Sequence, residues 1–140
     1  MQESFPSVRV GVAVLITRGD QLLLIRRHGS HGAGSWATPG GHLDFGEKPE
    51  QCGVREAREE VGVDVKELDF VAITNDWFED IQKHYITIWF RVCAFAGEPT
   101  IASPREMSDL GWYAWDALPQ PLFLPLACLV AGESYPPFRR

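Results

Sequence analysis

The sequence predicts an α/β fold in which a single domain, residues 1–140, carries a mixed β-sheet between helices. Residues 49–62 have apolar side chains at helical spacing, and runs of strand length precede and follow them. The last predicted element is a helix at residues 122–131, and Pro125 favours a start near that residue. The order of strands, helix, strands and helix is typical of a sheet with helices on its faces.

The first third of the chain predicts a β-hairpin followed by a loop. Residues 8–17 are a β-branched run, residues 18–20 have turn chemistry, and residues 21–27 are a second apolar run. Two such runs around a turn favour a hairpin. Residues 28–35 contain three glycines and no periodicity, which predicts a surface loop.

The central helix has recognisable ends and two different faces. Pro49 suits the first helical position, and Gly62 suits the exit from the helix. One narrow apolar stripe consists of Val54, Ala57 and Val61. Glu56, Glu59 and Glu60 lie on the other, broader face.

The second half of the chain predicts three further strands. Residues 68–78 and 85–95 are rich in β-branched and aromatic side chains and predict two long strands, which a polar loop at residues 79–84 connects. Residues 97–108 are typical of a loop, and residues 110–115 predict a short strand.

The three glutamates of the central helix are the strongest chemical feature. Carboxylates crowded on one helical face repel one another, and a fold gains nothing by holding them there unless a cation neutralises them. Mg²⁺ prefers oxygen ligands and is commonly held by carboxylates together with substrate phosphates. The face is therefore interpreted as a metal–diphosphate site, and a solvated acidic helix face is the alternative.

The spacing around these glutamates is specific. The run Gly41-x5-Glu47-x7-Arg55-Glu56-Ala57-x-Glu59-Glu60-x-Gly62-Val63 resembles the signature of the Nudix hydrolase family at every position. With each residue type at roughly 7% abundance, its seven fixed residues coincide by chance about once in a hundred million positions.

The resemblance implies a fold and a set of roles. The fold would be the Nudix-type α/β/α sandwich around a mixed β-sheet. The metal ligands would be the Gly40 carbonyl with the side chains of Glu56, Glu59 and Glu60. Glu106, in a later loop, would join these three glutamates as a catalytic group, and whether Glu56 or Glu106 activates the attacking water is left open. The residues that shape the motif would be Gly41, Glu47, Arg55 and Gly62, with Arg55 paired to Glu47.

The substrate contacts are hypotheses of lower specificity. Similar enzymes place a phosphate-binding arginine at the position of Arg27, for which a plain surface arginine is the alternative. His42 and His84 are candidate contacts because similar loops and strands recur in enzymes that cleave nucleoside triphosphates. Thr87, Phe123 and Leu126 are candidates for the wall of a base pocket, although core packing is the simpler explanation for an aromatic side chain.

The resemblance to MutT-like members implies Mg²⁺-dependent hydrolysis, with Mn²⁺ as a substitute, of a small molecule linked through a nucleoside diphosphate. Cleavage of a (deoxy)nucleoside triphosphate to monophosphate and pyrophosphate is favoured. Hydrolysis of ADP-ribose, a nucleotide sugar or a dinucleoside polyphosphate is the alternative within the family. A non-catalytic nucleotide-sensing module is the alternative outside enzymes, and retention of every motif carboxylate argues against it.

Composition restricts the partners. Thirteen basic residues against nineteen acidic ones give a net charge of −6, which disfavours a polymeric nucleic acid as partner. The first residues lack a leader pattern, no apolar run reaches the length of a membrane span, and the three cysteines have no metal or redox spacing. We therefore expect a cytoplasmic protein without a membrane partner, and a homodimer is left open.

Overall fold

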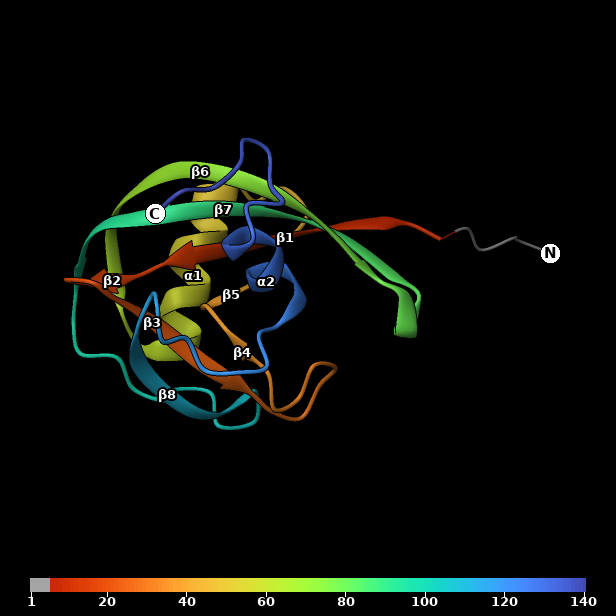
Figure 1. Cartoon of the computed structure of the whole chain (residues 1–140). Coiled ribbons are helices and arrows are strands. Elements are labelled where there is room, and N and C mark those ends of the chain that lie inside the picture. The colour runs from red at the N-terminus through yellow and green to blue at the C-terminus, as the bar shows by residue number, and fades with distance from the viewer. Residues whose placement is uncertain (1–5) are drawn as a thin grey trace.

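Residues 6–140 form two β-sheets and two α-helices (Figure 1). The structure, a computed structural model, describes residues 6–140. The first sheet has the order β5-β1-β7-β6 and is mixed, because β1 (Val8–Leu15) pairs parallel with β7 (Lys83–Ala96) and antiparallel with β5 (Gly40–His42). The remaining strand of this sheet, β6 (Asp64–Phe78), pairs antiparallel with β7.

The second sheet is antiparallel and is built around β3 (Gln21–Arg27). Its other strands are β2 (Thr17–Arg18), β4 (Trp36–Ala37) and β8 (Met107–Ala114). The predicted hairpin of residues 8–17 with 21–27 is therefore wrong except next to the turn, where β2 pairs with the start of β3. The strands β1 and β3 belong to different sheets. Both strands bury consecutive side chains, and a strand buried on both faces favours a place between layers.

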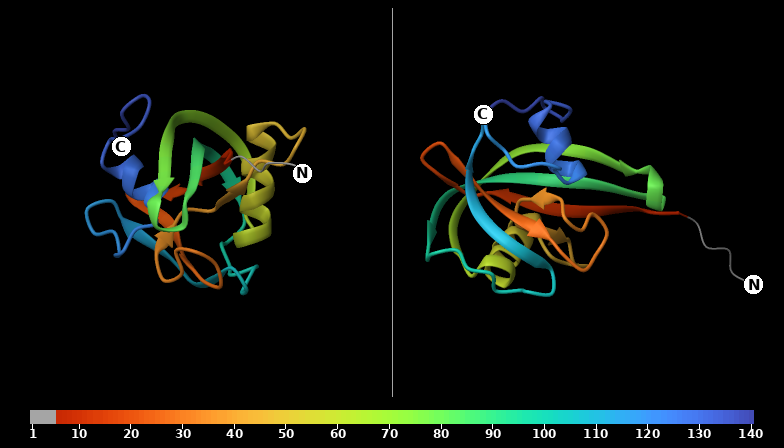
Figure 2. Two further views of the ribbon diagram at one scale, coloured as in Figure 1. Left: turned by 90° about the vertical axis from the view of Figure 1, so that its right-hand side faces the viewer. Right: turned by 60° about the horizontal axis from the view of Figure 1, so that its bottom comes forward.

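The two helices cover opposite faces of the mixed sheet (Figure 2). Along β1, Val12 and Val14 pack into the core that contains α1 (Pro49–Val61), whereas Ala13 and Leu15 pack into the core that contains α2 (Leu124–Val130). Successive side chains of a strand point to opposite faces, which explains the division. The predicted α/β sandwich around a mixed sheet is confirmed, and α2 begins one residue before Pro125.

Several predicted boundaries shift. The long hairpin of β6 and β7 is confirmed and extends beyond the predicted limits, with a short 3-10 turn, η1 (Glu79–Ile81), at its tip. The hairpin tip projects from the body of the molecule (Figure 1). The strand β8 begins at Met107, inside the predicted loop 97–108, because Met107 is buried and pairs with Arg27.

No helix in the described part of the chain is long and apolar enough to cross a membrane. The prediction that the chain starts without a leader falls on residues 1–5, which lie outside the described range.

Candidate active site

Two glycines allow β5 to approach both β1 and α1 closely. A Cβ atom on Gly40 would lie 2.4 Å from the carbonyl oxygen of Val12, and one on Gly41 would lie 2.4 Å from the carboxyl group of Glu56. A larger side chain at Gly40 would push β5 away from the backbone of β1, whereas one at Gly41 would displace the Glu56 carboxyl group. The strand β5 was not predicted, because three residues that include two glycines carry no strand pattern.

The α1 helix begins and ends as its sequence predicts. Its N-terminal residue is Pro49, and Gly62 takes the left-handed conformation with φ of 69°, which closes the helix. The backbone N–H of Lys48 donates to the side chain of Gln51 at 3.0 Å, which partly compensates for the lack of a capping hydroxyl or carboxylate at Lys48.

Arg55 connects the loop before α1 to the acidic face of the helix. Its Nε donates to Glu47 Oε2 at 2.8 Å, and its Nη1 donates to Glu56 Oε1 at 2.8 Å and to Glu59 Oε2 at 3.2 Å. Its Nη2 also donates to the His42 carbonyl. The hydrogen-bonded ion pair with Arg55 holds the pKa of Glu47 well below its usual range, at about 2. The predicted pairing of Arg55 with Glu47 is present.

Glu60 is the most buried acidic side chain of this face, with 6% of its surface exposed. Its Oε1 accepts a hydrogen bond of 2.7 Å from the backbone N–H of Gly40. Burial, with repulsion from Glu56 and Glu106, raises the pKa of Glu60 to about 8, although the Gly40 N–H and Arg27 oppose the shift. Burial also raises the pKa of Glu56 to about 7, against the effect of Arg55.

The structure brings Glu106 and Arg27 to the same place, and Glu59 to its edge. Glu106 lies near enough to Glu60 and Arg27 for mutual electrostatic effects, and its carbonyl accepts from the N–H of His28, directly after β3. Glu59 is more exposed, with 55% of its side chain accessible, and its contact is Arg55. Carboxylates from α1 and from the loop before β8, with Arg27 from β3, thus converge.

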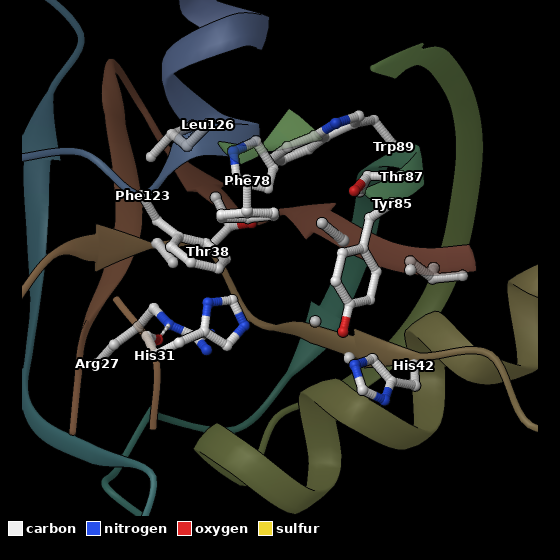
Figure 3. Close-up of a pocket in the computed structure, with 17 residues that line it drawn as sticks. Arg27, His31, Thr38, His42, Phe78, Tyr85, Thr87, Trp89, Phe123 and Leu126 are labelled. Atoms are coloured by element: carbon white, nitrogen blue, oxygen red, sulfur yellow. Dashed lines mark hydrogen bonds between the residues drawn. The ribbon is translucent and has the colours of Figure 1, made fainter. Parts of the chain in front are cut away.

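A pocket opens beside these carboxylates. Arg27, His42, Thr87, Phe123 and Leu126, all predicted as substrate contacts, line it. Figure 3 shows Arg27 and His42 on the side of the pocket that faces α1, with Thr87 and Leu126 on the opposite side. The same pocket is lined by Gly40 and Gly41, so the pocket and the acidic face share a wall.

Arg27 lines this pocket and is held in place by Phe123 and His31. Its guanidinium lies 3.9 Å from the centre of the Phe123 ring, and its Nε donates to the His31 carbonyl at 3.2 Å. Burial lowers its pKa, while Glu60 and Glu106 act in the opposite direction. A fixed guanidinium beside the carboxylates is suited to bind phosphate oxygens.

One predicted contact is not brought to the pocket. His84 lies on β7 with its ring hydrogen-bonded to Asn75 and edge-on to Trp77, outside the pocket lining. The alternation of strand side chains explains the position, because Tyr85 and Thr87 line the pocket and His84, one residue earlier than Tyr85, points to the other face.

The sequence analysis missed several pocket residues, among them His31, Thr38, Phe78 and Tyr85. His31 was assigned to a surface loop, yet the centre of its ring lies 5.0 Å from that of Phe78 and 5.5 Å from that of Phe123. The spacing of Tyr85 and Thr87, two residues apart on one strand, was the signal that could have identified Tyr85.

The donor set agrees with a hard divalent cation. Buried carboxylates with raised pKa values are stabilised by a nearby positive charge, and all proposed ligands are oxygen atoms, which Mg²⁺ prefers. Within residues 6–140, no three His, Cys, Asp or Glu side chains are already arranged to hold a metal ion. Glu56 and Glu59 instead contact Arg55, so a metal would have to compete with that arginine.

Comparison with known proteins identifies related chains. The sequence model of the NUDIX domain family matches residues 7–131. The NAD-capped RNA hydrolase NudC of Pseudomonas aeruginosa strain LESB58 is 36% identical over 115 residues, which cover 82% of this chain and 39% of that protein. NudC of Stutzerimonas stutzeri is 35% identical over 117 residues, which cover 84% and 40%. The chain thus spans less than half the length of these curated relatives.

Two solved structures illustrate the likeness in three dimensions. A MutT NUDIX hydrolase from Burkholderia pseudomallei superposes with a TM-score of 0.81 at 34% identity, covering 84% of this chain and 91% of that chain. The NUDIX domain of Shewanella oneidensis NrtR, in complex with ADP ribose, has a TM-score of 0.74 at 21% identity and covers 91% and 86%. The latter shows similarity of fold alone.

Proposed function

The chain belongs to the Nudix hydrolase family, and from this premise we propose that it hydrolyses a nucleoside triphosphate to a nucleoside monophosphate and pyrophosphate with Mg²⁺. One observation carries the proposal. An aromatic pocket suited to a nucleobase and a carboxylate cluster suited to a metal–phosphate complex share the wall formed by Gly40 and Gly41. A nucleotide placed with its base in the pocket would direct its phosphates towards α1.

Members of the family generally use a divalent metal, and in this chain Glu56, Glu59, Glu60 and the Gly40 carbonyl would hold it. When bound, the ion polarises a phosphate and lowers the pKa of water. Mn²⁺, with the same preference for oxygen ligands, would substitute.

The protein's own groups would position the phosphates and handle the proton. Arg27 would bind phosphate oxygens, held by Phe123 and the His31 carbonyl. A carboxylate must accept the proton of the attacking water, and a pKa near the working pH favours that task. Glu56, on the acidic face of α1, and Glu106, whose carboxylate accepts a hydrogen bond from Ser103, are the two candidates for this base.

A second candidate function is hydrolysis of a diphosphate that joins two groups, such as ADP-ribose, a nucleotide sugar or a dinucleoside polyphosphate. The NudC relatives, named as NAD-capped RNA hydrolases, favour it. The pocket walls described above would bind the base of either class of substrate, so the pocket does not separate the two.

A substrate panel with Mg²⁺ separates them. Nucleoside triphosphates should be cleaved with release of pyrophosphate, and hydrolysis in ¹⁸O-water should place the label in the monophosphate or in pyrophosphate. Label only in orthophosphate would contradict the proposed cleavage. Turnover of triphosphates at least about tenfold less efficient than that of ADP-ribose or a nucleotide sugar, a difference of about 1.4 kcal/mol, would replace the first function by the second.

A further inference from the structure

A chain of hydrogen bonds lies behind the pocket, between strands β6 and β7. Trp89 Nε1 donates to Thr74 Oγ1 at 2.9 Å, and Thr74 Oγ1 donates to Asp76 Oδ2 at 3.2 Å. Thr87 Oγ1 donates to the same Asp76 oxygen at 2.6 Å. Asp76 and Thr74 have no exposed surface, and Thr87 has 6%. Thr87 lines the pocket (Figure 3), so the chain ends at the ligand's side.

The direction of each bond in this chain follows from its first member. An indole N–H only donates, so Thr74 must accept from Trp89, and the Thr74 proton is then free for Asp76. Asp76 Oδ2 accepts from Thr74 and from Thr87. When Asp76 is ionised, the single hydroxyl proton of Thr87 is thereby committed to Asp76, and only the Thr87 lone pairs remain for the pocket.

A second hydroxyl in the pocket lacks this constraint. Thr38 Oγ1 is buried and has no partner within residues 6–140. A buried hydroxyl without a partner costs about 1–3 kcal/mol, which points to a ligand or water that completes it. Because nothing fixes its proton, Thr38 is able either to donate or to accept.

We infer that Asp76 is a specificity-determining residue, which fixes Thr87 as a hydrogen-bond acceptor and so selects nucleobases that present an exocyclic amino group. This inference rests on the proposed function, because it assigns the pocket to the base of the substrate. A base with a carbonyl at the same place would set two acceptors against each other in a buried site, which is costly.

The amino group is favoured over a ring N–H by its shape. An exocyclic amino group projects from the ring and reaches a hydroxyl at the wall of a pocket. The ring N–H of a dioxopyrimidine lies between two carbonyl oxygens, which would face the same Thr87 acceptor. Cytosine and adenine fit this requirement, and uracil and hypoxanthine are their matched oxo counterparts.

The test compares kcat/KM for cytosine against uracil and for adenine against hypoxanthine. Both pairs are measured as nucleoside triphosphates. The adenine and hypoxanthine pair is also measured as ADP-ribose and inosine diphosphate ribose. We expect a preference of at least about tenfold for the amino member in at least one pair, expressed mainly in KM, because sites that hydrogen-bond a substrate group discriminate strongly. Equal efficiencies in both pairs, or a preference for the oxo member, would overturn the inference and leave the hydrolase assignment intact. Failure to cleave any of these nucleotides would overturn both.

Variants separate a role in specificity from a role in stability. Thr87→Val removes the hydroxyl with little change in shape and should reduce the preference to less than about threefold, whereas Thr87→Ser should retain it. Asp76→Leu should also abolish the preference, because Thr87 is then free to rotate. Asp76→Asn should keep it, because the Trp89–Thr74 bond favours the amide oxygen in the place of Oδ2.

Thr38→Val is the matched control within the same pocket. It should affect both members of a pair alike and leave their ratio unchanged, since the Thr38 proton has no fixed direction. If Asp76→Leu does not fold, Thr87→Val still decides the question. A full preference in a folded Thr87→Val protein would overturn the inference.

Discussion

The acidic face of α1 and the pocket beside it are built in opposite ways. The acidic face comes from one continuous segment, in which Glu56, Glu59 and Glu60 are within five residues of one another. The pocket is assembled from β1, β3, β4, β5, β6, β7 and α2, together with residues of the connecting segments such as Phe123. Chemistry that any substrate of the family needs thus lies in a local motif, and recognition of one particular substrate depends on how distant segments pack.

The two regions also differ in how their polar groups are balanced. On the acidic face, the carboxylates of Glu56 and Glu60 repel each other, and Glu56 is paired with Arg55. Behind the pocket, one oxygen of the Asp76 carboxyl, Oδ2, accepts hydrogen bonds from two threonines. The first arrangement favours binding of a cation, whereas the second favours a fixed geometry. Substitutions in the two regions should therefore change different kinetic constants.

The largest effect is expected at Glu60. Glu60→Gln should lower kcat by at least about 10²-fold, about 2.7 kcal/mol of electrostatic stabilisation of the transition state. The folded state should not be weakened, because a glutamine oxygen still accepts from the Gly40 N–H and a buried charge is removed. Steady-state kinetics at saturating Mg²⁺ and a thermal melt in EDTA measure both.

The control for this prediction is Glu50→Gln, an exposed carboxylate in the first turn of the same helix. It should leave kcat unchanged. Near wild-type turnover in Glu60→Gln would remove Glu60 from the site and break the division between the two regions.

In the pocket the expected effect is smaller and falls on KM. Phe123→Leu removes the ring that contacts Arg27, His31 and Phe78. We expect KM to rise about tenfold, about 1.4 kcal/mol, and kcat to change less than about threefold, because the contact is the same in ground and transition states. Val130→Ala, at an exposed position of α2, is the control. A loss confined to kcat would mean that Phe123 acts by positioning Arg27 at the phosphates and not by binding the base.

Mg²⁺ should raise the melting temperature by several degrees in the absence of substrate, and this shift should depend on the acidic face of α1 and not on the pocket. An ion that binds only the folded state stabilises it by mass action, by about 2.7 kcal/mol at a hundred times its Kd. Thermal melts with Mg²⁺ and with EDTA should therefore differ by several degrees in the wild type and less in Glu60→Gln. The Phe123→Leu variant should keep the full difference. Equal midpoints in the wild type would indicate that the substrate brings the ion.

The features that the sequence predicted correctly are those that depend on residues close together in the chain. The bounds of α1, the Arg55–Glu47 pair and the crowding of acidic side chains were predicted because the residues concerned lie within a short segment. Thr87 and Phe123 were identified as pocket candidates, although their surroundings were not. Tyr85 and Asp76 were missed, because their positions depend on the register of β6 with β7, in which Asp76 pairs with Tyr85.

The separation of β1 from β3 was missed for a related reason. Turn residues predict that the chain reverses, and it does so at Gly19 and Asp20. They do not determine whether the strands on either side remain paired. That outcome depends on the parallel pairing of β1 with β7, which joins residues about 75 positions apart and has no local signal.

The smallest effect expected is a pH dependence of stability at Asp76. Burial raises the pKa of Asp76 above its ordinary value of 3.8, and the hydrogen bonds from Thr87 and Thr74 oppose that shift. His84 on β7 also opposes it, and the Cys128 thiol on α2 is the other titratable group nearby. A carboxyl group with a raised pKa binds its proton more tightly in the folded state, so its contribution to stability is full below pH 3.8 and declines as the pH rises through the folded value.

Asp76→Asn lacks this dependence, because an amide does not titrate. The melting temperature of the variant, relative to the wild type, should therefore increase as the pH rises from about 4 to 8, by a few degrees at most. Asp20→Asn, at an exposed turn, should show no such trend. A constant difference between Asp76→Asn and the wild type would mean that Asp76 keeps one protonation state over this range. A difference that moves in favour of the wild type as the pH rises would mean that its pKa is lowered, and that the carboxylate is stabilised by the two threonine hydroxyls more than it is destabilised by burial.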